Sequence, residues 1–93
     1  MRAIWKFHLP HHGEAEIAMP PGAEVLGVGV QRGGRIVAWA SVDTGSVGRP
    51  EQLTFVVRMT GESFEPVEGE RFVGTFQLDD GDYVGHVFVR GGR

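Results

Sequence analysis

Hydrophobic and polar residues alternate along most of this chain. That period is typical of β-strands, because successive side chains of a strand point to opposite faces of the sheet. Glycine, proline and aspartate residues separate the alternating segments, and no segment carries the i, i+3, i+4 apolar spacing that predicts a helix. The pattern predicts an all-β fold, a small antiparallel sandwich or barrel of about seven strands. These strands cover residues 2–9 and 14–19, both arms of a hairpin over 24–43, and residues 53–59, 71–78 and 83–90.

The hairpin over 24–43 turns at Gly33-Gly34, because glycine supplies the positive φ angles that a two-residue turn needs. We expect Arg32 to lie opposite Arg35, and this register sorts the side chains into two faces. The bulky face carries Leu26, Val28, Val30, Val37 and Trp39, and the other face carries Gly27, Gly29, Ala38 and Ala40. We call the face of Gly27, Gly29, Ala38 and Ala40 the bare strip. It predicts a surface against which another sheet, a partner subunit or a flat ligand lies. The alternative is a bend in a curved sheet.

The turn at 10–13 is expected to join residues 2–9 and 14–19 into a second hairpin. Both segments alternate, so each of them presents two distinct faces. In the first segment Trp5, Phe7 and Leu9 share one face and Ile4, Lys6 and His8 share the other; in the second segment Ala15, Ile17 and Met19 point inward.

Two longer segments between strands have the composition of loops. Residues 44–52 form a candidate mobile loop, and the acidic segment 60–70 is expected to be anchored by Phe64, which packs back onto the sheet. The strand between these loops is expected to bury Leu53, Phe55, Val57 and Met59.

Length and composition exclude several classes of protein. A chain of 93 residues is expected to fold as a single β-rich domain over 1–93. Its lack of cysteine excludes disulfide bonds, a thiol nucleophile and thiolate metal sites. A net charge of −3 argues against binding polymeric nucleic acid, which requires a basic surface. The apolar runs are too short for a membrane-spanning helix, and the first residues do not resemble a signal peptide. The absence of cysteine fits a cytosolic setting, which is the expected one.

No arrangement of residues in the sequence predicts catalysis or a metal centre. His8, His11 and His12 come nearest to a zinc site, but adjacent histidines in a turn diverge, whereas a site needs convergent ligands. The segment Asp79-Asp80-Gly81-Asp82 is expected to be a hairpin turn rather than a calcium loop, because a strand follows it. We therefore expect a protein that is not an enzyme and that uses no cofactor or metal ion.

Charged and aromatic residues near the bare strip indicate a ligand site. Arg32 and Arg35, directly cross-strand, would repel each other, and a phosphate or carboxylate between them would relieve the repulsion. Two solvated arginines at an exposed turn are the alternative. Trp5 and Trp39 belong to the core unless they border the strip, where each would stack on a planar ligand. The candidate ligand-binding residues are Arg32, Arg35, Trp39, Trp5, Lys6 and Arg58, the cations serving to bind phosphate groups.

Short motifs spread over nearly the whole chain resemble a family of small proteins of unknown function encoded by bacteriophages and prophages. The motifs are Ala3-Ile4-Trp5-Lys6-Phe7, Met19-Pro20 followed by Gly22-Ala23-Glu24, Val28-Gly29-Val30-Gln31, Trp39-Ala40 with Val42-Asp43, and Gly74-Thr75-Phe76-Gln77 ahead of His86-Val87-Phe88. The chain departs from the family in its glycine-rich loop at 45–50 and in its C-terminal Gly-Gly-Arg. The resemblance implies an accessory protein that is made in an infected bacterium and acts by binding.

These expectations combine into one leading hypothesis. The chain is expected to be a phage-encoded, non-enzymatic accessory protein, a homo-oligomer in the cytoplasm of the infected bacterial host. It would counter host defence by sequestering a small phosphorylated nucleotide signal. The alternatives are a module that inhibits a host protein through a sheet edge or through the 60–70 loop, and a minor component of virion assembly.

Overall fold

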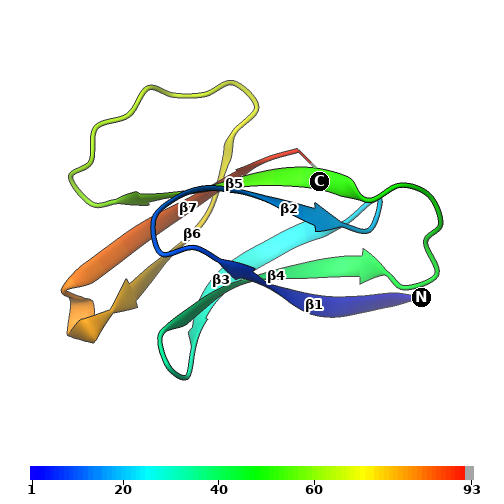
Figure 1. The fold of residues 1–93 in the computed structure, drawn as a ribbon, viewed down its shortest axis with the longest axis horizontal. Coiled ribbons are helices and arrows are strands. Elements are labelled where there is room, and N and C mark those ends of the chain that lie inside the picture. The colour runs from blue at the N-terminus through cyan, green and yellow to red at the C-terminus, as the bar shows by residue number, and fades with distance from the viewer. Residues whose placement is uncertain (92–93) are drawn as a thin grey trace.

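In the computed structural model, which describes residues 1–91, the chain forms seven strands and one short 3₁₀ turn (Figure 1). They are β1 (Arg2–Leu9), β2 (Gly13–Met19), β3 (Glu24–Gln31), β4 (Arg35–Asp43), β5 (Glu51–Met59), β6 (Arg71–Leu78), η1 (Asp79–Gly81) and β7 (Tyr83–Arg90). One antiparallel sheet has the order β1-β4-β3 and the other has the order β2-β5-β7-β6. The two sheets do not close into a barrel, so the predicted all-β fold is confirmed in its sandwich form. The last two residues of the Gly-Gly-Arg end lie outside the described residues.

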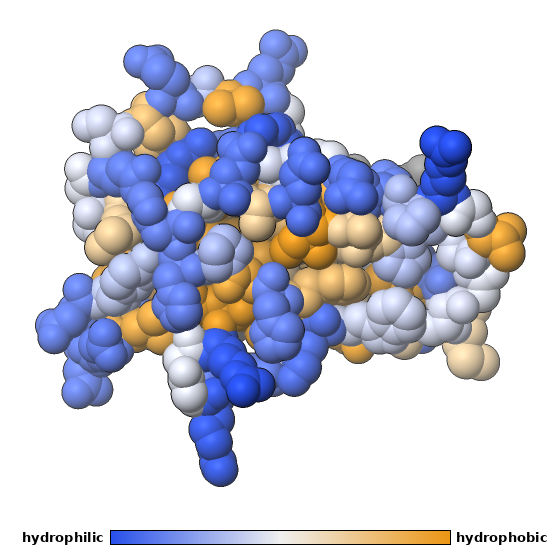
Figure 2. Space-filling model, in the orientation of Figure 1, coloured by the Kyte–Doolittle hydropathy of each residue, from blue (hydrophilic) through white to orange (hydrophobic). Residues whose placement is uncertain are grey.

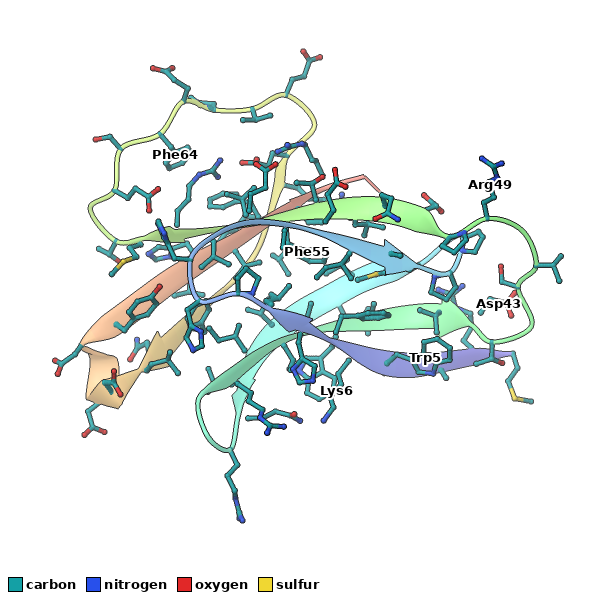
Figure 3. All side chains as sticks on the ribbon, in the orientation of Figure 1. Trp5, Lys6, Asp43, Arg49, Phe55 and Phe64 are labelled. Carbon is teal, nitrogen blue, oxygen red and sulfur yellow. The ribbon has the colours of Figure 1, made fainter. Side chains whose placement is uncertain are left out.

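The core lies between the two sheets and is centred on β5. Leu53, Phe55 and Val57 alternate inward along this strand and are each at most 1% exposed, and Figure 3 shows Phe55 between the sheets. Burying a side chain of this kind contributes about 1.5–3 kcal/mol to stability. The prediction that Met59 is buried with them is wrong: it is 37% exposed, because β5 ends there and the chain turns away. Across residues 1–91, no helix is long and apolar enough to cross a membrane.

β1 and β2 do not pair with each other, so the predicted hairpin of residues 2–9 and 14–19 is wrong. β1 pairs with β4 and β2 pairs with β5, so the turn between β1 and β2 carries the chain from one sheet to the other. The reason lies in β4, whose side chains are largely buried on both faces, as is typical of a central strand. A central strand needs two neighbours, and β1 supplies the second one beside β3.

β3 and β4 form the predicted central hairpin, but the register differs by one residue from the prediction. Gln31, rather than Arg32, lies opposite Arg35, so the loop contains three residues instead of two. Positive φ angles at Gly33 (+84°) and Gly34 (+73°) close this loop, and the Gly34 N–H donates to the carbonyl of Gln31 at 3.1 Å. A shift of one residue turns the side chains of a strand to the opposite face.

The bare strip therefore does not exist as one surface. Ala38 and Ala40 point inward and are completely buried in the core, whereas Gly27 and Gly29 lie on the outer face of the sheet. Trp39 lies directly opposite Gly27, so the prediction that Trp39 belongs to the core face is also wrong. A β-bulge just before Gly27 shifts the register once more near the start of β3.

The two sides of the sandwich differ. On one side β3 packs against β6: a Cβ atom added to Gly74 of β6 would lie 2.9 Å from Cγ2 of Val28 on β3, so glycine permits the close approach. On the other side the edge strands are β1 and β2, which run in opposite directions across the front of Figure 1. We call this second side the open side, because its two edge strands belong to different sheets and do not pair with each other.

Candidate functional site

Most of the predicted ligand-binding residues gather around the outer face of the three-stranded sheet. The strand registers place Lys6 of β1 and both Arg35 and Trp39 of β4 on this face, and Arg32 follows in the adjoining loop. Lys6 lies directly opposite Trp39 across the β1–β4 pair. In Figure 3, Lys6 points away from the four-stranded sheet. We call the surface formed by these four residues the cationic face.

The indole of Trp39 lies over β3, at a place where that strand has no side chains. Its neighbours across the β3–β4 pair are Gly27 and Gly29. A Cβ atom at position 29 would lie 3.2 Å from Nε1 of Trp39, whereas a Cβ atom at position 27 would meet nothing within 4 Å. Gly29 therefore leaves room for the indole on the outer surface of the sheet, where Trp39 is half-buried.

A hydrogen bond links the two edge strands of this sheet above β4. Nζ of Lys6 on β1 donates to Oε1 of Gln31 on β3 at 2.9 Å, so the Lys6 side chain reaches across the strand between them. Val37 of β4 shares this outer face and is nevertheless completely buried.

Positive charge predominates at the hairpin end of this face. Lys6 and Arg35 are exposed there, with Arg2 further along β1. The acidic residues that the register places on the face, Glu24 and Asp43, lie at its opposite end. An anion would therefore meet attraction near Lys6 and Arg35 and repulsion only at the far end.

Two carboxylates at the surface have pKa values below their usual range, and each of them accepts a hydrogen bond from a backbone N–H group of the chain. The backbone N–H of Gly45 donates to Asp43 at 3.0 Å, and the N-terminal ammonium lies 3.5 Å away; these contacts lower the pKa of Asp43. The N–H of Met59 donates to Glu62 at 3.0 Å, and Nε2 of His12 lies 2.8 Å from the same carboxylate, so the pKa of Glu62 is lowered as well.

Trp5 lies on the opposite face of β1 from Lys6 and is therefore not part of the cationic face. It shares the inner face with Phe7 and Leu9, as predicted. Trp5 is 44% exposed, because it lines a pocket of about 310 Å³ on the open side together with Phe7, Met19 of β2 and three prolines. Figure 2 shows hydrophobic residues gathered across the middle of this view, between polar residues above and below.

Arg58 also lies away from the cationic face, on the outer face of the four-stranded sheet. It is 7% exposed, and its guanidinium donates to Glu70 at 2.6 Å. Cζ of Arg58 lies 4.0 Å from the centre of the Phe64 ring and 4.8 Å from that of Phe88. Phe64 thereby holds its loop against the sheet, which confirms the predicted anchor (Figure 3). The guanidinium of Arg58 is thus bound within the chain. The alternating pattern of the residues around it does not indicate this contact.

His11, His12 and His86 each make a hydrogen bond within the chain. Nε2 of His11 lies 3.1 Å from the carbonyl of Gly34. His86, on β7, lies between two hydroxyls: Nε2 is 2.7 Å from that of Thr60 and Nδ1 is 3.0 Å from that of Thr75. Within the described part of the chain, no group of three or more His, Cys, Asp or Glu side chains is placed to hold a metal ion.

Comparison with known proteins assigns the chain to a family without assigning an activity. The chain belongs to the family described as Domain of unknown function (DUF7352), whose model matches residues 1–93. The resemblance to a family of unknown function over the whole chain is thereby confirmed. No curated protein and no solved structure matches the chain.

Proposed function

We propose that the chain is a binding protein whose cationic face captures a small planar ligand that carries phosphate groups, such as a phosphorylated nucleotide. The observation that carries the proposal is the cross-strand pair of Lys6 and Trp39, with the exposed Arg35 further along the same face. An indole supplies a surface on which a base stacks, and ammonium and guanidinium groups bind phosphate oxygens.

The spacing of these residues along β4 suits a nucleotide. Trp39 and Arg35 are four residues apart on one strand, which separates their Cα atoms by roughly 14 Å at the usual rise per residue. The Lys6 ammonium is bonded to Gln31, the residue directly opposite Arg35. A base stacked on Trp39 would therefore direct its phosphate groups towards Lys6 and Arg35.

The proposed role is capture without conversion of the ligand. The carboxylates of Asp43 and Glu62 are occupied by backbone N–H groups, and both ring nitrogens of His86 are bonded to threonine hydroxyls. Glu62 and His86 belong to the loop and the strand of the four-stranded sheet, and Asp43 lies at the end of the cationic face away from Arg35. Their positions support sequestration rather than acid–base catalysis.

The proposed setting is the cytoplasm of a bacterium infected by a phage. The resemblance of the motifs to proteins of phages and prophages supports an origin in a phage genome. There the chain would counter host defence by lowering the free concentration of a phosphorylated nucleotide signal. Such a role requires affinity and abundance, and it requires no turnover.

Tryptophan fluorescence tests this proposal. In a Trp5→Phe background the remaining tryptophan is Trp39, and we expect its emission to change saturably when phosphorylated nucleotides are titrated, linear and cyclic ones included. Because Arg35 contributes a charge-assisted contact, Arg35→Ala should weaken binding about tenfold. Arg49→Ala is the matched control, since Arg49 is exposed on the loop before β5 (Figure 3).

Two results would count against the proposal. Equal affinities of Arg35→Ala and the parent protein would remove Arg35 from the site. Emission that no nucleotide in the panel changes, at low ionic strength where exposed charges attract most strongly, would overturn the proposal itself.

A further inference from the structure

The open side combines two features that a folded chain in isolation rarely leaves uncovered. β1 and β2 are sheet edges, and the free edge of a strand carries unpaired N–H and C=O groups that another strand can bind. Between these edges lies the apolar pocket of about 310 Å³, and Trp5 at its rim is 44% exposed. Ile4, on the outer face of β1, is 64% exposed.

The charges of the two edge strands are complementary. The outer face of β1 carries cationic and titratable groups at Arg2, Lys6 and His8, all exposed. The outer face of β2 carries Glu14 and Glu16, which are also exposed. The inner faces of both strands are apolar. A β1 strand and a β2 strand placed side by side would therefore bring opposite charges together, and neither strand has such a neighbour in the monomer.

We propose that the open side is the interface of a symmetric dimer, in which β1 of each copy pairs antiparallel with β2 of the other copy. A two-fold axis parallel to the strands exchanges the two sheets, so β1 of one copy meets β2 of its partner twice. Each resulting sheet contains seven strands, three from one copy and four from the other. Both free edges and the pocket between them are covered in this arrangement. The proposal rests on the sheet edges and the pocket rather than on a ligand, and it shares only Lys6 with the cationic face.

The turn between β1 and β2 fixes the register of this pairing. Residues 10–12 alone separate the two strands, so Leu9 and Gly13 lie at nearly the same height along the sandwich. Rotation about an axis parallel to the strands leaves that height unchanged. Leu9 of one copy therefore lies level with the partner's Gly13. The other pairs follow by moving from Leu9 towards the start of β1 and from Gly13 towards the end of β2, one residue at a time.

This register makes favourable pairs on both faces of the joined sheets. On the outer face, Lys6 lies opposite the partner's Glu16, which joins opposite charges across the strands. On the inner face, Trp5 lies opposite the partner's Ile17, an aromatic and β-branched pair of the kind that stabilises antiparallel sheets. Lys6 turns towards Gln31 in the single copy and is exposed, so it can exchange that neutral contact for a charged one.

Mass measurement of charge variants tests the interface. We expect native mass spectrometry and light scattering to give twice the 10.1 kDa of one chain. Glu16→Lys should raise the dissociation constant about tenfold or more, because like charges then face each other at two symmetric positions. Adding Lys6→Glu to Glu16→Lys should restore dimerisation. Glu24→Lys, the same change on β3, is the control and should leave the dimer intact. A monomeric parent protein would overturn the proposal.

Disulfide formation tests the register. The chain has no cysteine, so new thiols report only on the positions chosen. Ile4 lies opposite the partner's Ala18 in the proposed register, and within one copy these outer-face residues point in opposite directions. We expect Ile4→Cys with Ala18→Cys to give a covalent dimer on a non-reducing gel. Ile4→Cys with Glu14→Cys, displaced by four residues, should not.

The charge reversal tests the surface, and the disulfide tests the register; a dimer that responds to Glu16→Lys without forming the Ile4–Ala18 bond refutes the register. A dimer that responds to the charge reversal and forms the Ile4–Ala18 bond supports the interface. A dimer that ignores Glu16→Lys and yields no such bond uses another surface, which refutes this one. Nucleotide binding by Arg35→Ala is measured separately and bears only on the cationic face.

Discussion

The two outer faces of the sandwich carry similar residues and use them in opposite ways. On the four-stranded sheet, Arg58 is 7% exposed, bonded to Glu70 and covered by the ring of Phe64. On the three-stranded sheet, Lys6 and Arg35 are exposed and face no nearby acid. A cationic side chain is available to a ligand only where the fold places no acidic side chain beside it. The residue type alone does not reveal this.

The lengths of two loops explain this difference. The segment from β5 to β6, residues 60–70, is long enough to fold back over its sheet and to deliver both an aromatic ring and a buried carboxylate. The loop between β3 and β4, residues 32–34, contains three residues and cannot cover the face beside it. The cationic face is therefore open because its hairpin is short.

The largest effect is expected from breaking the ion pairs of the four-stranded sheet. Glu70, whose side chain is 4% exposed, bonds both Arg58 at 2.6 Å and Arg90 at 3.2 Å. Glu70→Gln leaves Arg58 buried without its counter-charge, and losing one partner of such a pair costs about 3 kcal/mol of unfolding free energy. Urea denaturation measures this loss. Glu68→Gln, at an exposed position of the same loop, should change stability by less than about 0.5 kcal/mol. If the two variants unfold at the same midpoint, the pair is not what holds this face together.

The next effect concerns the glycines beneath Trp39. Gly29→Val places a side chain 3.2 Å or less from the indole nitrogen, and such overpacking costs about 1–3 kcal/mol. The displaced indole should also bind the nucleotide more weakly. Gly27→Val is the matched control, because a Cβ atom there meets nothing within 4 Å. Chemical denaturation and the fluorescence titration compare the two variants, and equal losses for both would mean that the indole does not depend on Gly29.

The alternation of the sequence was sufficient to predict the strands and the faces of β1. It could not predict which strands pair, because a period of two residues fits any antiparallel partner. For this reason residues 2–9 and 14–19 were expected to form a hairpin, although they lie in different sheets. In the proposed dimer the two segments would pair after all, between two copies rather than within one.

The cationic face could be predicted in composition but not in geometry. Two glycines in a row allow a loop of either two or three residues, and the choice decides whether Trp39 points inward or outward. Arg58 and Glu70 are twelve residues apart with an irregular loop between them, so no local spacing signals their contact. The pairing of Arg58 with Glu70 therefore becomes visible only in the folded structure.

A smaller effect is expected from loosening the 60–70 loop. Phe64→Ala removes one of the two rings that flank the Arg58 guanidinium, while the bond to Glu70 remains. A partly desolvated cation–π contact contributes about 1 kcal/mol, so we expect a loss of that size in urea denaturation. Val67→Ala truncates another half-exposed apolar side chain of the loop and controls for lost packing. A larger loss for Val67→Ala would show that the loop is anchored elsewhere.

The smallest effect is expected from acid, through the carboxylate of Glu62. Its pKa lies below the ordinary value of 4.5 in the folded chain, chiefly because the N–H of Met59 donates to it, and His12 adds a second contact. A lowered pKa means that folding favours the ionised form, so the contribution to stability is present above the unfolded-state pKa and is lost as the pH falls through the folded-state value. The urea midpoints of the parent and of Glu62→Gln should therefore differ near neutral pH and converge below about pH 4. Glu65→Gln in the same loop controls for removal of a charge. If the difference between parent and Glu62→Gln persists unchanged into acid, the contribution of Glu62 does not come from its ionised form.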